Sequence, residues 1–141
     1  MTGPGRVSSP TALDWLSLAL ICASAVLCGL LELMLVGQFY IGGQIVPLII
    51  IAAIANNIGL PVLGYRAMGT PRGAILPVVF WLIIVLFLSI YTRPEGDLLV
   101  IAAYGQQWGF YGVLLLGGIA GFVSILFVGQ GFSLRRGRKG R

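Results

Sequence analysis

The chain has 141 residues, of which 58% are hydrophobic and 9% are charged, and its formal net charge is +5. A soluble globular domain carries about 25% charged and about 45–50% apolar residues, so this composition excludes that class. Apolar runs recur along the chain, and each is long enough to cross a hydrocarbon core about 30 Å thick. The sequence therefore predicts one all-α fold, a polytopic transmembrane bundle of four helices.

The first span is expected at residues 13–36, after a Pro- and Gly-rich N-terminal segment, residues 1–12. Pro10, Thr11 and Asp14 favour a helix start, and Trp15 suits an interfacial anchor. A cleavable signal peptide has an apolar core of about 7–15 residues. Because this run is longer and three more follow it, we expect a retained span.

The second and third spans are expected at residues 45–65 and 74–91, with Pro47 and Pro77 near their starts, where proline is tolerated. The apolar stretch 98–128 would be about 46 Å long as one helix, which exceeds the membrane. The sequence YGQQWG also interrupts it. We therefore expect an interfacial segment at 98–103, a fourth span at 108–128, and a basic tail at 129–141.

The basic residues predict the orientation. Five of them lie in the tail: Arg135, Arg136, Arg138, Lys139 and Arg141. With four spans, Arg6, Arg66 and Arg72 share their side, and only Arg93 lies on the other. The positive-inside rule then places both termini in the cytoplasm. At this surface the tail can bind anionic lipid of the inner leaflet, at about 1 kcal/mol per basic residue. No aromatic residues are interleaved with these charges, so nucleic acid is not an expected partner.

Glu32 lies in the outer third of the first span, on one helical face with Ser17, Ser24 and Cys28. An intramembrane charge costs several kcal/mol unless it is paired, so this face should meet protein or water. Glu32 is then either a proton- or cation-coupled carboxylate or a structural residue. In the structural case it meets lipid headgroups or pairs with Arg93 at the outer surface.

Asn56 and Asn57 lie near the middle of the second span. Interhelical hydrogen bonds by such amides contribute roughly 0.6–2 kcal/mol. The pair either joins helices or lines a polar cavity reached from Glu32, with Pro61 loosening the helix. Because Glu32 and the two amides differ in depth, we do not expect a direct contact without water.

Small residues four positions apart permit close helix packing. Such pairs are plentiful, and they include Ala25 and Gly29, Ala55 and Gly59, and Gly117 and Gly121. Internal packing is expected to use two of them. The surface formed by Gly112, Gly117 and Gly121 can instead dock a partner or a second copy.

Catalysis has few suitable groups in this sequence. The chain has no His, and Cys22 and Cys28 are six residues apart on a helix, so no metal-ligand set or cofactor site is expected. No nucleophile is paired with a base, and no two acids share a rigid site. We therefore expect a protein that is not an enzyme.

The loop RPEGD, Arg93 to Asp97, joins the third and fourth spans, and Pro94 and Gly96 suit a type I turn. With the four-helix layout and short length, this loop resembles a family of small, uncharacterised actinobacterial membrane proteins. The resemblance implies a bacterial cytoplasmic (plasma) membrane location and no particular mechanism.

Sparse polar chemistry and abundant small-residue faces favour an accessory, assembly or stabilising subunit of a membrane complex, or a self-associating module. The outer rim, formed by Glu32, Arg93, Glu95 and Asp97, is the expected contact site. The alternative is a small oligomeric proton-coupled transporter that uses Glu32. Small multidrug transporters are similar in size and in one glutamate of the first helix, but their aromatic pattern around it is missing here.

Overall fold

A computed structural model describes residues 10–35, 40–41, 44–45, 48–90 and 107–138. Its helices form four spans, each long and apolar enough to cross a membrane, which confirms the predicted all-α transmembrane class. The first three spans are α1 (Ala12–Leu35), α2 (Leu48–Met68) and α3 (Pro71–Ile90). The fourth is a continuous rod of α4 (Gln107–Gly112), the π-helical turn η1 (Val113–Gly117) and α5 (Gly118–Arg138). Between α1 and α2, the two-residue strands β1 (Tyr40–Ile41) and β2 (Gln44–Ile45) pair antiparallel.

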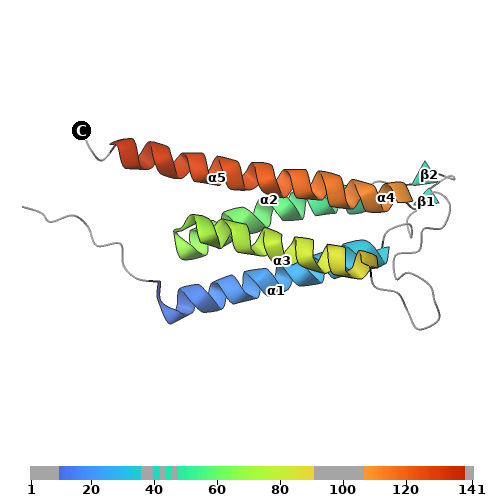
Figure 1. The fold of residues 1–141 in the computed structure, drawn as a ribbon, viewed down its shortest axis with the longest axis horizontal. Helices are drawn as coiled ribbons and strands as arrows, with labels where there is room; N and C mark the ends of the chain where they lie inside the picture. The colour runs from blue at the N-terminus through green and yellow to red at the C-terminus, as the bar shows by residue number, and fades with distance from the viewer. Residues whose placement is uncertain (1–9, 36–39, 42–43, 46–47, 91–106, 139–141) are drawn as a thin grey trace, which may run out of the picture.

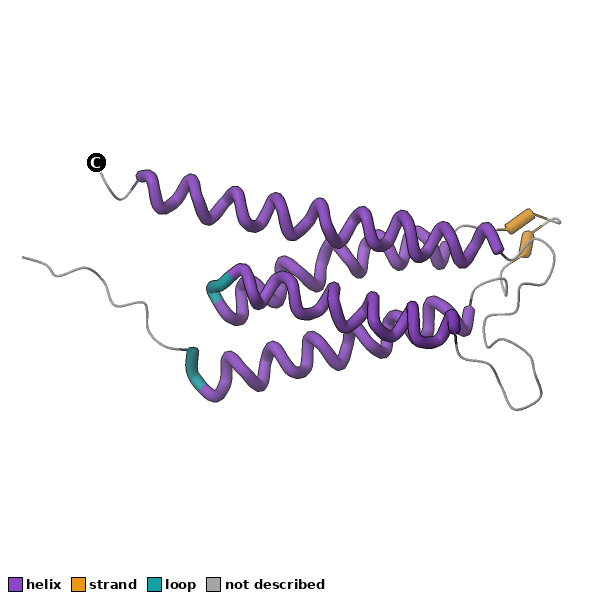
Figure 2. Tube along the Cα trace, viewed as in Figure 1, coloured by secondary structure: helices purple, strands orange, loops and turns teal. Residues whose placement is uncertain are grey.

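The spans lie side by side and alternate in direction (Figure 1). The start of α1, the turn between α2 and α3, and the end of α5 lie at one end of the bundle, and the short strands lie at the other (Figure 2). Both α1 and α5 pack against α2 and α3, so α2 and α3 form the centre of the bundle.

Local hydrogen bonds fix the start of α1 where the sequence predicted it. The Thr11 Oγ1 atom accepts from the Asp14 backbone N–H at 3.4 Å. In return, Asp14 Oδ2 accepts from the Thr11 backbone N–H at 2.7 Å and from its hydroxyl at 2.8 Å. This reciprocal arrangement is a capping box, with Asp in place of the more usual Glu.

The turn between α2 and α3 depends on glycine. Gly69 has a φ of 62°, the left-handed conformation that often ends a helix, and its N–H donates to the Tyr65 carbonyl at 2.7 Å. Beyond the turn, the backbones of Gly64 and Gly73 touch, because a Cβ atom at either position would collide with the carbonyl oxygen of the other. This pair holds α2 and α3 together at this end and was not among the small-residue pairs expected from the sequence.

Most helix ends lie within three residues of the predicted span ends, but α5 does not. It continues to Arg138, so the positions of Arg135, Arg136 and Arg138 prolong a helix where we expected a separate tail. Arginine and leucine favour helix, and no proline interrupts this segment. At the other spans, Pro47 precedes α2 and Pro77 lies inside α3.

Several predicted features lie outside the described residues. They are the loop with Arg93, Glu95 and Asp97, the expected interfacial segment 98–103, and the tail residues Lys139 and Arg141. The outer-rim and loop hypotheses therefore stay predictions.

The core runs along the bundle axis between the spans. Its buried apolar side chains are Ala25, Leu33, Ala53, Leu60, Trp81, Val85, Leu88 and Val113. Many leucine, isoleucine and phenylalanine side chains instead point outward, as in a bundle solvated by lipid tails. Helix association in such a bundle depends on close packing and hydrogen bonds, because the lipid is as apolar as the side chains.

The close approach of α2 to α3 gives a first prediction. Gly64→Ala should destabilise the fold by about 1–3 kcal/mol, because the added methyl group has no room beside the Gly73 carbonyl. The matched control is Gly59→Ala in the same helix, where an added Cβ meets nothing within 4 Å. It should be neutral or stabilise by up to about 1 kcal/mol through helix propensity. Unfolding by dodecyl sulfate, followed by circular dichroism in mild detergent, measures both; equal stabilities would contradict the packing.

Candidate functional site

Glu32 lies inside the bundle, three residues before the end of α1, and its side chain is 5% exposed. The indole Nε1–H of Trp81 in α3 donates to Glu32 Oε2 at 2.7 Å. The amide Nδ2–H of Asn56 in α2 donates to Glu32 Oε1 at 3.3 Å. These three side chains, which we call the Glu32 cluster, therefore join α1, α2 and α3 through both oxygens of one carboxyl group.

Two expectations about Glu32 are wrong. It does not meet lipid headgroups, because it is buried against Trp81 and Asn56. It also contacts Asn56 directly, although helix positions put Glu32 about 5 Å and Asn56 about 12 Å from the ends of their helices. That comparison used backbone depth alone, whereas a glutamate and an asparagine side chain can together bridge several ångströms along the bundle.

Trp81 is fully buried, and two glycines make room for its ring. A Cβ atom at Gly29 of α1 would lie 3.3 Å from Trp81 Cδ1, and one at Gly117 of η1 would lie 3.0 Å from Trp81 Cη2. Sequence analysis missed Trp81, although a signal was present. Tryptophan usually lies at the membrane interface, and one in mid-span must find an acceptor for its N–H. Glu32, near the opposite end of α1 from Asp14, is that acceptor.

The small-residue pairs divide between the interior and the surface. Ala25 is fully buried, and a Cβ atom at Gly29 would lie 2.8 Å from Ile84 Cγ2, so this pair packs α1 against α3. Ala55 is exposed, and nothing lies within 4 Å of a Cβ atom at Gly59, so this pair makes no such packing contact.

The glycine surface of the fourth span is used inside the chain. A Cβ atom at Gly112 would collide with Ile50 of α2, and one at Gly121 would lie 3.0 Å from Val78 of α3. Gly117 lies against Trp81 as described. These three glycines therefore serve helix packing inside the chain, and docking of a partner or second copy at this surface stays an untested alternative.

Ser17 and Ser24 do not join Glu32 in an inward-facing stripe. Both are exposed, and their hydroxyl groups donate to the carbonyls of Leu13 and Leu20 in their own helix, at 2.8 and 3.0 Å. A hydroxyl group bonded to the carbonyl four residues earlier needs no partner from another helix. The residues of this face therefore differ in their surroundings: Glu32 is buried inside the bundle, whereas Ser17 and Ser24 lie on the outside of α1.

Asn57 faces a different part of the interior from Asn56. It is fully buried, and its Nδ2–H donates to the Ala53 carbonyl at 3.0 Å. Its Oδ1 atom has no hydrogen-bond partner among the described residues, and a Cβ atom at Gly121 would lie 3.3 Å from it. Adjacent helix positions are about 100° apart, so one amide serves the Glu32 cluster while the other faces the fourth span.

Ser124 is a second residue that sequence analysis missed. Its hydroxyl group donates to the Ile58 carbonyl at 3.0 Å and so ties α5 to α2. The neighbouring carbonyl, that of Asn57, would accept from residue 61 in a regular helix, but Pro61 has no N–H. Ser124 bonds the carbonyl next to the one that Pro61 frees, and so it ties α5 to α2 beside the proline.

The chemistry available to the Glu32 cluster is one carboxyl group and two N–H donors. Within the described part of the chain, no group of three or more His, Cys, Asp or Glu side chains could hold a metal ion. The arrangement is suited to joining helices, and each hydrogen bond is worth roughly 0.6–2 kcal/mol in a membrane bundle.

The cluster predicts a coupling energy between Glu32 and Trp81. In a double-mutant cycle of Glu32→Gln and Trp81→Phe, we expect an interaction of about 1–2 kcal/mol, because each single variant leaves a buried polar group poorly matched. The control cycle combines Glu32→Gln with Ser124→Ala, which breaks a bond at the α2–α5 interface. The effects of those two changes on the free energy of unfolding should be additive within about 0.5 kcal/mol. Dodecyl sulfate unfolding gives all the free energies, and additivity of the Glu32–Trp81 pair would argue against the hydrogen bond.

Comparison with known proteins adds no relative to these observations. No family model, no curated protein and no solved structure matches the chain. The site is therefore interpreted from its own geometry.

Proposed function

We propose that this integral membrane protein is non-catalytic and acts through contacts, as an accessory, assembly or stabilising subunit of a membrane protein complex. The observation that supports this role most directly is the burial of the Glu32 carboxyl group between neighbouring helices. Both of its oxygens accept hydrogen bonds from neighbouring helices, and only 5% of the side chain is exposed. The carboxyl group buried inside the bundle is thus engaged in packing.

The alternative is a small oligomeric transporter that couples to protons at Glu32. It is favoured by the position of an ionisable group inside a span, which often marks an ion pathway. Coupling requires that water or substrate reaches the carboxyl group. In the described residues, Trp81 and Asn56 cover it, and the two grooves between helices described below do not include it.

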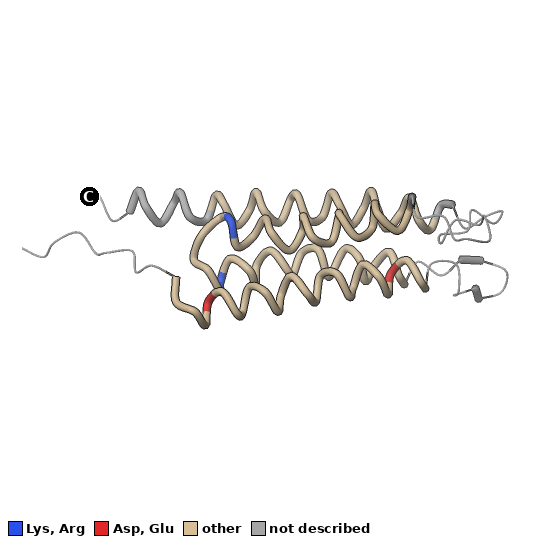
Figure 3. Tube along the Cα trace, turned by 60° about the horizontal axis from the view of Figure 1, so that its bottom comes forward, with Lys and Arg blue, Asp and Glu red and all other residues tan. Residues whose placement is uncertain are grey.

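A bacterial plasma membrane with both termini in the cytoplasm is part of the proposal. Asp14, Arg66 and Arg72 lie in terminal turns at the end of the bundle where α5 also finishes, whereas Glu32 lies towards the other end (Figure 3). With the basic positions at the end of α5, the positive-inside rule assigns this end to the cytoplasm.

The outward face of α1 offers a surface for contacts. It carries leucines that are between 57% and 73% exposed, at intervals of three, four and seven residues: Leu13, Leu16, Leu20, Leu27 and Leu31. These positions follow successive turns of the helix, so their side chains form one seam along which two helices can interdigitate. We call this surface the leucine face, and we propose it as the contact with a partner span.

Native purification tests the proposed role. The tagged full-length chain, extracted in mild detergent, should retain a membrane protein partner or a second copy at fixed stoichiometry. Leu20→Ala combined with Leu27→Ala should remove most of that partner. The matched control, Leu115→Ala with Leu126→Ala, changes exposed leucines of the fourth span and should retain it. A monomer without any co-purifying protein, or equal loss in both double variants, would refute the proposal.

Glu32→Gln separates this role from transport. In the accessory role, the variant should keep the partner and show the same pH-dependent uptake or resistance as the wild type. A proton-coupled transporter would lose its pH dependence, since glutamine cannot release a proton. Equal behaviour in both assays removes the transporter.

A further inference from the structure

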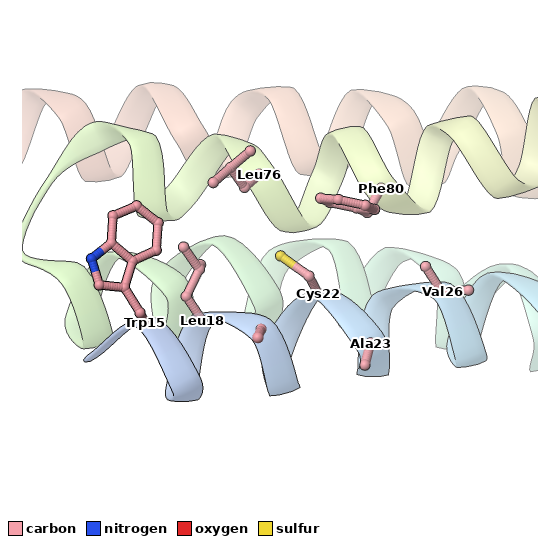
Figure 4. Close-up of a pocket in the computed structure, with 8 residues that line it drawn as sticks. Trp15, Leu18, Cys22, Ala23, Val26, Leu76 and Phe80 are labelled. Carbon is pink, nitrogen blue, oxygen red and sulfur yellow. The ribbon is translucent and has the colours of Figure 1, made fainter. Parts of the chain in front are cut away.

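A groove runs between α1 and α3 on the side of the bundle that faces lipid (Figure 4). Its volume is about 420 Å³. Side chains of α1 and α3 that line it include Trp15, Leu18, Cys22, Val26, Leu76 and Phe80. The groove lies along the first half of α1, whereas Glu32 lies near the end of that helix. Its lining is almost entirely apolar.

The dimensions of the groove match one lipid tail. From Trp15 to Val26 the helix advances about 16 Å, and one leaflet of the hydrocarbon core is about 15 Å thick. The small side chains of Ala19 and Ala23 leave room on the α1 side of the groove for an acyl chain to lie along the helix. An apolar slot of this length, parallel to the helices, fits an extended acyl chain and has no groups for a polar solute.

A positive charge lies at the membrane-surface end of the same groove. Arg72, Leu76 and Phe80 are spaced four residues apart, so they share one face of α3, and Arg72 is exposed one turn beyond the lining. Long helical side chains lean towards the N-terminus, which directs Arg72 away from the apolar slot and towards the headgroups.

Asp14, in the first turn of α1, makes its hydrogen bonds to Thr11 rather than to Arg72. The Asp14 carboxylate is engaged with the backbone N–H and hydroxyl group of Thr11. Among the described residues, Arg72 makes no ion pair with a carboxylate. We propose that the groove holds one acyl chain of an anionic phospholipid whose phosphate lies at Arg72. This site is separate from the proposed accessory role and from lipid binding by the basic tail.

The second groove provides a matched control within the chain. It lies between α2 and α5, has a volume of about 300 Å³, and is lined by Ile58 and Val62 of α2. Arg66 follows Val62 by four residues and so lies on the same face of α2, one turn beyond the lining of this groove. Trp15 lines only the first of the two, so its fluorescence reports on the Arg72 groove.

Quenching of Trp15 by brominated lipid tests the site. The full-length protein is placed in phosphatidylcholine bilayers that contain either phosphatidylglycerol or phosphatidylcholine with brominated chains. Subtracting the signal of Trp15→Phe isolates Trp15. One basic residue contributes about 1 kcal/mol, so brominated phosphatidylglycerol should quench Trp15 at about fivefold lower mole fraction than brominated phosphatidylcholine.

The variants assign this preference to the groove. Arg72→Gln should bring the ratio close to one, Arg72→Lys should keep most of it, and Arg66→Gln should leave it unchanged. Ala23→Leu, which fills the slot, should lower the ratio while Ala55→Leu on the exposed face of α2 does not. A wild-type ratio near one, or an unchanged ratio in Arg72→Gln, overturns the site. If neither brominated lipid quenches Trp15, the proposal is also overturned, because a protein segment would then cover the groove.

Discussion

The hydrogen bond from Trp81 to Glu32 is the constraint that organises this bundle. A carboxyl group and an indole N–H are both costly in hydrocarbon without partners, and here each supplies the partner of the other. Their meeting brings α1 and α3 together at one depth. It also requires space for a fully buried indole ring, which Gly29 and Gly117 provide by lacking side chains. Gly29 and Gly117 are therefore required for packing, because a larger side chain at either position would crowd the indole ring.

The same layer recruits the other two spans. Asn56 of α2 occupies the second carboxyl oxygen, and η1 presents Gly117 to the face of Trp81. A π-helical turn changes the register of a helix locally, and here it coincides with the packing of Val113 and Gly117 in the core. Apolar helices in lipid gain little from one rotation over another, whereas a buried polar cluster is satisfied in only one arrangement. We infer that the Glu32 cluster sets the register of the four spans.

The sequence predicted the part of the fold that follows from hydrophobicity, and it was less informative where specific neighbours decide. Long apolar runs define four spans because the bilayer sets their length. Spacing alone cannot tell which small residues meet: an added Cβ at Gly59, four residues after Ala55, would meet nothing within 4 Å, while Gly64 and Gly73, nine residues apart, bring two backbones into contact. Backbone depth likewise excluded the contact between Glu32 and Asn56, because it ignored side-chain reach. Trp81 was overlooked as one more apolar residue in an apolar run.

The two sides of α1 separate stability from recognition. Its inward side carries Glu32 and Gly29, which are committed to α2 and α3, so substitutions there should change folding before they change any partner. Its outward side carries the leucine face, and its flank forms one wall of the lipid groove. The leucine face takes no part in the core, whereas the groove also includes the buried side chains of Leu18 and Cys22, so exposed positions on the outside of α1 can be altered while the bundle keeps its register. If the protein acts through contacts, function should therefore respond to conservative changes on the outside of α1 that leave unfolding free energy unchanged, and a transporter centred on Glu32 should show the reverse.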